Sequence, residues 1–285
     1  MATHLVTVAI GSDAATPFGI ETGIRYELIG PDGTRVTFND DTDRDFVGYV
    51  EDITGLDGAE VRESYEQLVE EDGARHFAFY HGRRPVTITG PLNPNVFGTA
   101  ANRNITRLLR ASNAMTADAV LRWTPTGGVP VEISARRTSP PRISGQRVKT
   151  YQVGLTAADP RIYATTPSVA TQPLSSGSAS LVCANAGSAS TSPLVTISGP
   201  FTNPTLTKGS LSMSLTSTMV AGQSVTIDFA NRTIVNQAGA SIYSVLNYTT
   251  SQWFDLAPGS STIVATVTGA TAATIINASW RSAWI

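Results

Sequence analysis

One dense cluster of acidic residues has a spacing that could bind a calcium ion. Asp41, Asp43 and Asp45 occupy alternate positions of a possible calcium loop. The sixth position, where glycine allows a sharp turn, is Phe46, and the twelfth, where a bidentate glutamate is usual, is Asp52. Carboxylates this close together must otherwise be solvated or paired with arginine. We therefore expect an exposed acidic loop, with calcium binding as the alternative.

A second segment concentrates positive charge on both sides of Pro140 and Pro141. Its cations are Arg136, Arg137, Arg142, Arg147 and Lys149. A nucleic-acid site would need them on one face with aromatic residues between them, and no aromatic residue lies between the first and the last. A loop or arm that contacts a neighbouring subunit fits the same pattern. We therefore do not expect nucleic-acid binding by this segment.

The sequence lacks the motifs that organise common catalytic sites. It has no Gly-x-Ser-x-Gly elbow, no Gly-x4-Gly-Lys, no Gly-x-Gly-x-x-Gly and no His-Glu-x-x-His. Serine is abundant in the second half of the chain, but no histidine occurs there to act as its base. A glycosidase there would need Asp228 and Asp255, although aspartate at strand ends is more often structural. We expect no enzyme activity, no cofactor and no bound metal.

Aromatic residues near the C-terminus offer another chemistry, the stacking of sugar rings. Tyr243, Tyr248 and Trp253 are followed by further aromatics that end with Trp280 and Trp284. The cores of β-sandwiches also contain many such side chains. We expect most of them in the core, with a glycan-stacking surface of Trp253, Tyr243 and Tyr248 as the alternative.

The overall composition narrows the class of protein. The 285 residues carry a formal charge of −2 and 41% hydrophobic residues, which suffices for a core and argues against general affinity for nucleic acid. The single cysteine, Cys183, excludes an internal disulfide scaffold. No apolar stretch is long enough to span a membrane, and the residues from Met1 onward lack the features of a signal peptide. We expect a soluble, β-rich protein made in the cytosol.

Charge divides the chain into two parts. Of the 20 Lys and Arg and the 22 Asp and Glu, residues 166–285 keep only Lys208, Arg232, Arg281, Asp228 and Asp255. This second part is instead rich in Ser and Thr, which suit the solvent face of a sheet. The change predicts two domains, 1–165 and 166–285, joined by a linker over residues 165–173.

The first part alternates strand patterns with one helical pattern. Residues 24–28 and 35–38 predict a hairpin, and residues 75–80 and 85–89 predict a second. Further strands are expected at residues 131–135 and 151–155, separated by a long loop.

One segment has helical spacing. Ile105, Leu108 and Leu109 fall on one face and predict an amphipathic helix over residues 99–112. Three arginines fall on another face, which we expect to be solvated. They are Arg103, Arg107 and Arg110.

The second part shows short alternating runs between Gly, Pro and Asn residues. Such runs at close spacing predict an antiparallel β-sandwich. The expected strands lie at residues 194–197, 211–215, 224–229, 233–235, 242–245, 261–267 and 274–280.

Several stretches together carry a resemblance to a known family. They span residues 52–62, 71–74, 83–90 and 151–163 in the first part, and residues 203–206, 221–228, 253–259 and 280–284 in the second. With these patterns the chain resembles the siphophage distal tail proteins, which form rings at the tip of long non-contractile tails. The resemblance covers nearly the whole chain except the Ser/Thr-rich residues 166–192.

The resemblance implies a fold, a function and a set of partners. The fold would be mainly β, with a tail-tube-like β-barrel or sandwich carrying one α-helix, and a C-terminal antiparallel β-sandwich of jelly-roll or galectin-like type. Six copies would form a ring in the virion tail, between the tail-tube protein and the tail hub or baseplate protein. The tape measure protein and the genome would pass through the lumen, and no membrane is involved.

We expect the ring contacts in three charged segments, the acidic residues 40–52, the basic residues 136–149 and the helix. The candidates are Arg103, Arg107, Arg110, Arg136, Arg137, Arg142, Asp41, Asp43 and Asp45. Complementary charge between the first two segments would fix register more than affinity. The alternative function is a carbohydrate-binding module for attachment to the host surface.

Overall fold

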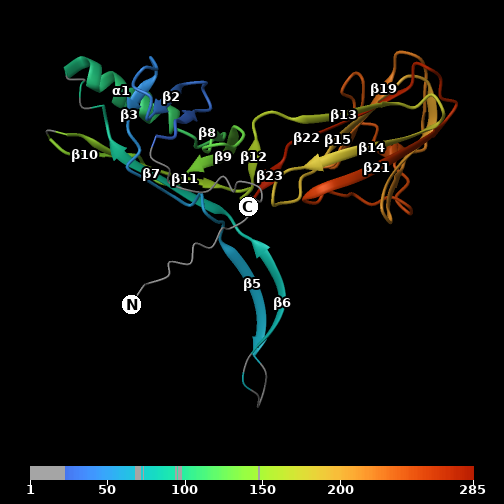
Figure 1. Cartoon of the computed structure of the whole chain (residues 1–285), viewed down its shortest axis with the longest axis horizontal. Coiled ribbons are helices and arrows are strands. Elements are labelled where there is room, and N and C mark those ends of the chain that lie inside the picture. The colour runs from blue at the N-terminus through green and yellow to red at the C-terminus, as the bar shows by residue number, and fades with distance from the viewer. Residues whose placement is uncertain (1–22, 68–71, 73, 94, 96–97, 147) are drawn as a thin grey trace, which may run out of the picture.

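The chain folds into two bodies of strands, and a long two-stranded arm projects from the first of them (Figure 1). The computed structural model describes residues 23–67, 72, 74–93, 95, 98–146 and 148–285. The expected absence of a signal peptide concerns the first residues of the chain, which lie outside the described ones.

The first body is a β-sandwich. Its strands are β1 (Tyr26–Ile29), β2 (Arg35–Phe38), β3 (Phe46–Gly48), β4 (Asp52–Thr54), β7 (Arg84–Pro91), β8 (Ala119–Trp123), β9 (Val131–Arg137), β10 (Arg142–Ser144), β11 (Thr150–Ala157) and β12 (Ile162–Ala164). They follow the order β3-β2-β1-β8-β9-β11-β7-β4, with β10 beside β11 and β12 beside β9. The described strands form no closed barrel, so the sandwich alternative of the prediction is the correct one.

Alternation of side chains explains why these segments form strands around one core. In β11, Tyr151, Val153 and Leu155 are buried, while the residues between them face outward. In β9, Val131 and Ile133 point inward in the same way. This pattern of period two matches a sheet with one covered face, and it confirms the strands expected at 131–135 and 151–155.

The predicted helix is confirmed as α1 (Gly98–Ala111), which packs against β2 and β3. Leu108 and Ala111 are fully buried against the sheet, and Ile105 packs at the edge of this contact. Leu109 is 38% exposed, so its expected place in the buried stripe is wrong. No helix among the described residues is long and apolar enough to cross a membrane.

The second body is the predicted antiparallel sandwich. One sheet has the order β13-β22-β15-β19-β20 and the other β14-β21-β16-β17, with β18 beside β16. The strands are β13 (Ser168–Pro173), β14 (Ser178–Asn185), β15 (Leu194–Ser198), β16 (Phe201–Lys208), β17 (Leu211–Ser214), β18 (Thr218–Met219), β19 (Ser224–Asp228), β20 (Thr233–Asn236), β21 (Gly259–Thr268) and β22 (Ile275–Trp280). Six of the seven expected strands are present.

Two local predictions for the second part are wrong. Residues 243–245 form the short 3-10 helix η1 (Tyr243–Val245), because the chain turns there instead of pairing. Residues 168–173, expected as a linker, form the edge strand β13 on β22. Their small side chains give little hydrophobic alternation, so the pairing partner decides the structure.

The second expected hairpin is also wrong. The strand β6 (Ala74–His81) pairs with β5 (Val61–Gln67), whereas β7 pairs with β11 and β4. Val86 and Ile88 of β7 are buried in the core, but Phe77 and Phe79 of β6 are about 60% exposed. Between β6 and β7 the chain therefore passes from the exposed arm into the core of the first body.

The C-terminus of the chain returns to the first body. The strand β23 (Ala283–Trp284) pairs with β12, and Trp284 belongs to the buried cluster of the first body. A separate cluster, from Leu174 to Trp280, fills the second. The last residues thus fasten one body to the other.

We predict that Trp284→Ala lowers the free energy of unfolding by about 3–5 kcal/mol, because it leaves a cavity between β12 and its neighbours. Urea unfolding followed by circular dichroism measures the change. Tyr248→Ala is the control, since this aromatic side chain is 65% exposed. Equal, small effects of both substitutions would contradict the placement of Trp284.

Candidate assembly surfaces

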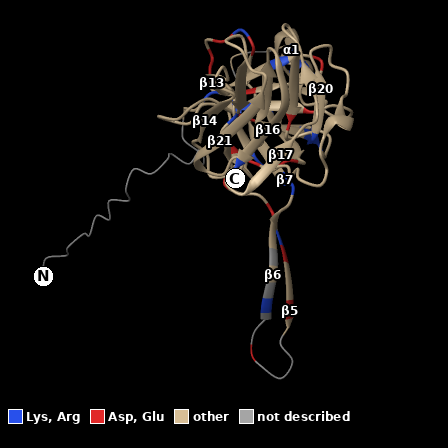
Figure 2. Ribbon diagram, turned by 90° about the vertical axis from the view of Figure 1, so that its right-hand side faces the viewer, with Lys and Arg blue, Asp and Glu red and all other residues tan. Residues whose placement is uncertain are grey.

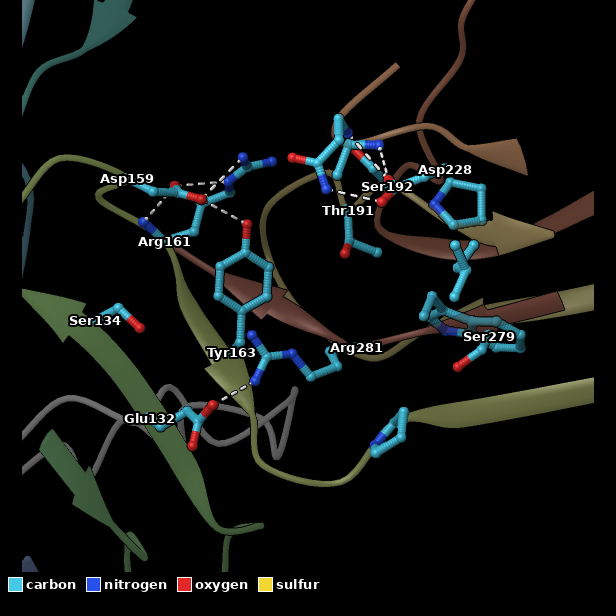
Figure 3. A pocket seen from close by; sticks show the side chains of 16 residues that line it. Glu132, Ser134, Asp159, Arg161, Tyr163, Thr191, Ser192, Asp228, Ser279 and Arg281 are labelled. Atoms are coloured by element: carbon cyan, nitrogen blue, oxygen red, sulfur yellow. Dashed lines mark hydrogen bonds and ion pairs between the residues drawn. The ribbon is translucent and has the colours of Figure 1, made fainter. Parts of the chain in front are cut away.

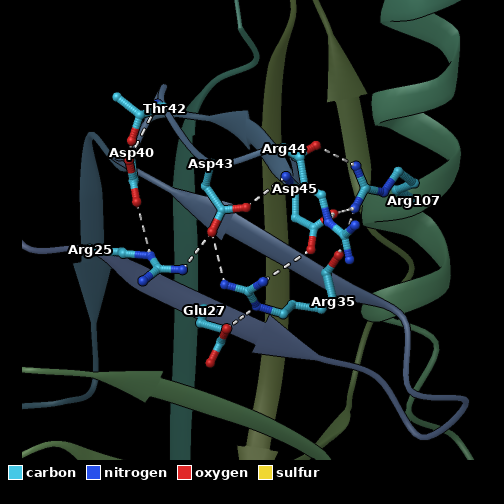
Figure 4. A network of polar contacts seen from close by, with 9 residues as sticks. All are labelled: Arg25, Glu27, Arg35, Asp40, Thr42, Asp43, Arg44, Asp45 and Arg107. Carbon is cyan, nitrogen blue, oxygen red and sulfur yellow. Dashed lines mark hydrogen bonds and ion pairs between the residues drawn. The ribbon is translucent and has the colours of Figure 1, made fainter.

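The acidic segment and the helix meet in one intrachain network (Figure 4). The Asp43 carboxylate accepts hydrogen bonds from Arg25 at 2.6 Å and Arg35 at 2.8 Å. The Asp45 carboxylate accepts one from Arg35 at 3.1 Å and is also paired with Arg107 of α1. These carboxylates are therefore neutralised within their own chain.

The network fixes the loop to the helix and to β2. Arg107 also donates to the backbone oxygens of Arg35 at 3.1 Å and Arg44 at 3.2 Å. A hydrogen bond from the Asp45 backbone N–H lowers the pKa of Asp43 despite burial, and the arginines lower it further. This carboxylate therefore stabilises the fold above its ordinary pKa, and the stabilisation is lost as the pH falls through the lowered value.

These contacts answer the calcium hypothesis in part. The carboxylates of Asp43 and Asp45 face guanidinium groups, Asp41 is exposed, and Asp52 lies in β4 beside β7. Among the described residues, no group of three or more His, Cys, Asp and Glu side chains could hold a metal ion. Most carboxylates of this loop are therefore paired with arginine and are not fully exposed to solvent.

The other predicted contact residues lie apart from this network. Arg110 pairs with Asp32 at 3.0 Å, and Arg136 pairs with Asp118 at 2.6 Å. The Arg137 guanidinium contacts the sulfur of Met115. Arg103 is exposed on α1, and Arg142 is exposed on β10. Their roles as ring contacts stay a prediction.

The arm formed by β5 and β6 is an exposed surface that the sequence patterns did not predict. All seven residues of β5 are exposed, and the arm extends away from both bodies (Figures 1 and 2). Its large exposed side chains are Val61, Tyr65, Phe77, Phe79 and Tyr80, each 56–68% exposed. The Asp72-Gly73 dipeptide between the two runs is a hairpin signal that could have indicated the arm.

The root of the arm is anchored firmly in the body. Arg84 at the start of β7 is fully buried, and its guanidinium donates to the backbone oxygens of Leu56 at 2.8 Å and Gly55 at 3.3 Å. Gly55 has a φ of 87°, and a Cβ atom there would lie 1.8 Å from the Pro85 oxygen. Any larger residue would push the root away from β7.

A polar pocket of about 590 Å³ lies between the two bodies (Figure 3). Arg281 of the second body pairs with Glu132 of β9, and Arg161 donates to the Ser190 oxygen at 3.1 Å. Both guanidinium groups lie over the Tyr163 ring, at 4.8 Å for Arg281 and 5.5 Å for Arg161. The pocket is thus the seam in which charged contacts join the bodies.

Asp159 strengthens this seam. Its carboxylate accepts hydrogen bonds from Arg161 at 2.9 Å and from the Tyr163 hydroxyl at 2.7 Å. Burial raises the pKa of Asp159, but these hydrogen bonds outweigh it and the pKa is lowered. The carboxylate therefore stays ionised and orients both partners.

The three candidate glycan-stacking residues lie together at the surface of the second body. The Tyr243 and Trp253 rings are stacked, with centroids 6.3 Å apart and planes 12° apart, and the exposed Tyr248 lies 5.8 Å from Tyr243. Phe254, Trp280 and Trp284 are buried, as expected for core aromatics. The cluster offers an aromatic surface and stays a candidate site.

Residues 186–284 match the family model of the siphovirus-type tail component, C-terminal domain. The crystal structure of the SPP1 Dit (gp 19.1) protein, described as a paradigm of the hub adsorption apparatus in Gram-positive infecting phages, matches with a TM-score of 0.69 and 13% identity. The match covers 91% of this chain and 99% of that one.

A second solved structure is less similar to the chain. The phage P2 baseplate in its activated conformation with Ca matches with a TM-score of 0.46 and 7% identity, over 90% of this chain and 97% of that chain, which is too low to carry an argument. No curated protein sequence matches the chain. The fold predicted from the sequence is confirmed by the similarity to the SPP1 protein.

We predict that Asp45→Ala destabilises the fold by about 3 kcal/mol, because it leaves the partly buried Arg35 and Arg107 without their shared carboxylate. Thermal and urea unfolding measure the change. Asp41→Ala, in the same loop but exposed, is the matched control and should alter the free energy of unfolding by less than about 0.5 kcal/mol. If both variants unfold like the wild type, the network does not hold the loop.

Proposed function

We propose that the chain is a siphophage distal tail protein that forms a ring, a hexamer, at the tip of a long non-contractile phage tail. This ring would join the tail tube to the tail hub or baseplate. The resemblance to siphophage distal tail proteins noted in the sequence agrees with the family match and with the SPP1 structure.

The observation that carries the proposal is the exposed arm. A two-stranded hairpin without a third strand or a covering layer is marginally stable in water at best. This arm also exposes aromatic side chains that would gain from burial, at about 25 cal/mol for each Å² removed from water. A neighbouring subunit that covers the arm would supply both the layer and the burial.

The proposed ring needs a head-to-tail contact, in which the arm of one subunit contacts a different face of the next. A head-to-tail contact closes into a ring when its rotation divides a full turn, and sixty degrees gives six subunits. The six arms would then be related to one another by the rotation axis of the ring.

The proposed ring has defined neighbours. The last ring of the tail-tube protein would lie above it, and the tail hub or baseplate protein below. The tape measure protein and the genome would pass through the lumen. The protein would be made in the host cytoplasm and would act at the tail tip in a structural role that requires no catalysis.

The aromatic cluster of the second body supports a second candidate function, carbohydrate binding for attachment to the host. The exposed Tyr248 beside the partly buried Tyr243 and Trp253 gives an aromatic surface on which a sugar ring could pack. This function would add to the ring instead of replacing it.

The ring predicts a particle mass of about 180 kDa, since each chain weighs 30.0 kDa. The double variant Phe77→Ser with Phe79→Ser should shift the mass to that of the monomer, because it removes two exposed aromatics of the arm. Light scattering after gel filtration measures the mass, and circular dichroism checks the fold.

Val182→Ser is the control for this experiment, as Val182 is a 62% exposed apolar residue on β14, far from the arm in the sequence. It should keep the ring. A wild-type chain that stays at 30.0 kDa at high concentration would contradict the ring, and an arm variant that keeps the ring would contradict the role of the arm in it.

Glycan arrays test the second candidate. We predict that Tyr248→Ala weakens binding to a retained glycan about tenfold, because one stacking ring is lost. Ile275→Ala, an exposed residue of the same body, should bind as the wild type does. No glycan retained by the wild type, or retention unchanged in Tyr248→Ala, would exclude this cluster as the site.

A further inference from the structure

The polar pocket between the two bodies has the size of a binding site for a small molecule. Its volume of about 590 Å³ lies within the range of about 300–1,000 Å³ that is usual for such sites. Residues of β9 and of the segment 159–163 line it from the first body, and residues of β19 and β22 line it from the second (Figure 3). A ligand in this pocket would therefore contact both bodies at once.

Two guanidinium groups are held in fixed orientations in the pocket. Arg281 pairs with the largely buried Glu132, and Arg161 pairs with Asp159 at 2.9 Å. A guanidinium group carries five N–H donors, so one carboxylate partner uses only part of this capacity. Because the existing pairs already orient both side chains, binding a ligand there would cost little conformational entropy.

An oriented acceptor lies in the pocket on the second body. One carboxylate oxygen of Asp228, at the end of β19, accepts hydrogen bonds from the backbone N–H groups of Ala230 at 2.9 Å and Asn231 at 3.0 Å. The other oxygen accepts one from the Asn231 side-chain amide at 2.7 Å. A carboxylate has about four acceptor sites, so these bonds orient Asp228 and leave it able to accept a further bond from a hydroxyl group.

Part of the lining is apolar. Leu194, at the start of β15, lines the pocket and is 41% exposed. Pro167 and Pro193 belong to the same lining. These side chains form a surface for C–H groups, whose burial contributes about 25 cal/mol for each Å² removed from water. The ligand that suits the pocket therefore has C–H faces as well as hydroxyl groups.

The charge of the lining argues against an ionic ligand. Three carboxylates, those of Glu132, Asp159 and Asp228, accompany the two guanidinium groups. An anion would have to displace a carboxylate from Arg161 or Arg281 and would leave that carboxylate unpaired. Among the described residues, no group of three or more His, Cys, Asp and Glu side chains could hold a metal ion. A neutral molecule with several hydroxyl groups meets all of these conditions.

We propose that the pocket between the two bodies binds a short neutral saccharide, whose hydroxyl groups contact the guanidinium groups and Asp228 and whose C–H face lies against Leu194. The site is separate from the aromatic cluster of the second body, since Tyr243, Tyr248 and Trp253 do not line this pocket. The inference therefore depends neither on that cluster nor on the proposed ring.

Filling the pocket tests the proposal. Ser134 of β9 and Ser279 of β22 line the pocket from the two bodies, so a tryptophan at either position would occupy the space of the ligand. The probe is an array of neutral and acidic mono- to tetrasaccharides, and each retained saccharide is then titrated in solution by calorimetry. We expect the wild type to retain a neutral saccharide, and Ser134→Trp and Ser279→Trp to weaken its binding at least about tenfold.

Two controls accompany these variants. Ser180→Trp makes the same substitution at an exposed position of β14 that does not line the pocket, and it should bind as the wild type does. Tyr248→Ala should also leave the binding of this saccharide unchanged, which separates the pocket from the aromatic cluster. Circular dichroism checks the fold of each variant.

A conservative variant gives a second readout that does not depend on filling the pocket. In Arg281→Lys the charge that pairs with Glu132 remains, but a single ammonium group replaces the planar group with its five donors. Binding of the saccharide should weaken about tenfold, while the midpoint of urea unfolding should stay close to that of the wild type. This variant decides the question if the tryptophan variants do not fold.

Each result has a defined consequence. A wild type that retains no saccharide overturns the proposal, and so does binding that is unchanged in the folded tryptophan variants or, if these do not fold, in Arg281→Lys. Loss of binding in Tyr248→Ala alone assigns the saccharide to the aromatic cluster and overturns the pocket. Retention of acidic saccharides only would overturn the neutral class of ligand. The particle mass tests the ring separately, so none of these results decides it.

Discussion

The exposed apolar surface of the arm is the constraint on which the proposed assembly depends. Two strands that carry aromatic residues in solvent have no core of their own, and they gain stability when another surface covers them. The body of the chain is built to present this arm at a fixed place. Arg84 holds the root from inside the core, and Gly55 lets the backbone pass close to β7.

The same logic explains the distribution of charge. In the first body the acidic loop and α1 neutralise each other, so Asp43 and Asp45 act as internal ties. The seam between the bodies uses Glu132, Arg281 and Tyr163 in a similar way, and β23 adds a strand to the first body. Charge that is satisfied internally holds the parts of the subunit together.

Much of the fold follows from local patterns. Alternation predicts β9, β11 and most strands of the second sandwich, and the spacing of Ile105 and Leu108 predicts α1. Errors arise where a partner distant in sequence decides. The segment of β6 has good strand propensity, yet its pairing with β5 and not β7 depends on which strand enters the core. The edge strand β13 lacks large alternating side chains, so its sequence resembles a linker.

The candidate surfaces were predictable to a smaller degree. The charged residues can be recognised from composition, but which of them are paired within the chain depends on three-dimensional neighbours such as Arg35 and Asp118.

The central claim is that a neighbouring subunit covers the arm, and hydrogen–deuterium exchange on the purified particle tests it most directly. We predict that the backbone amides of β5 and β6 exchange slowly in the particle and rapidly in the arm variant that stays monomeric. Rapid exchange of these amides in the intact particle would contradict the account.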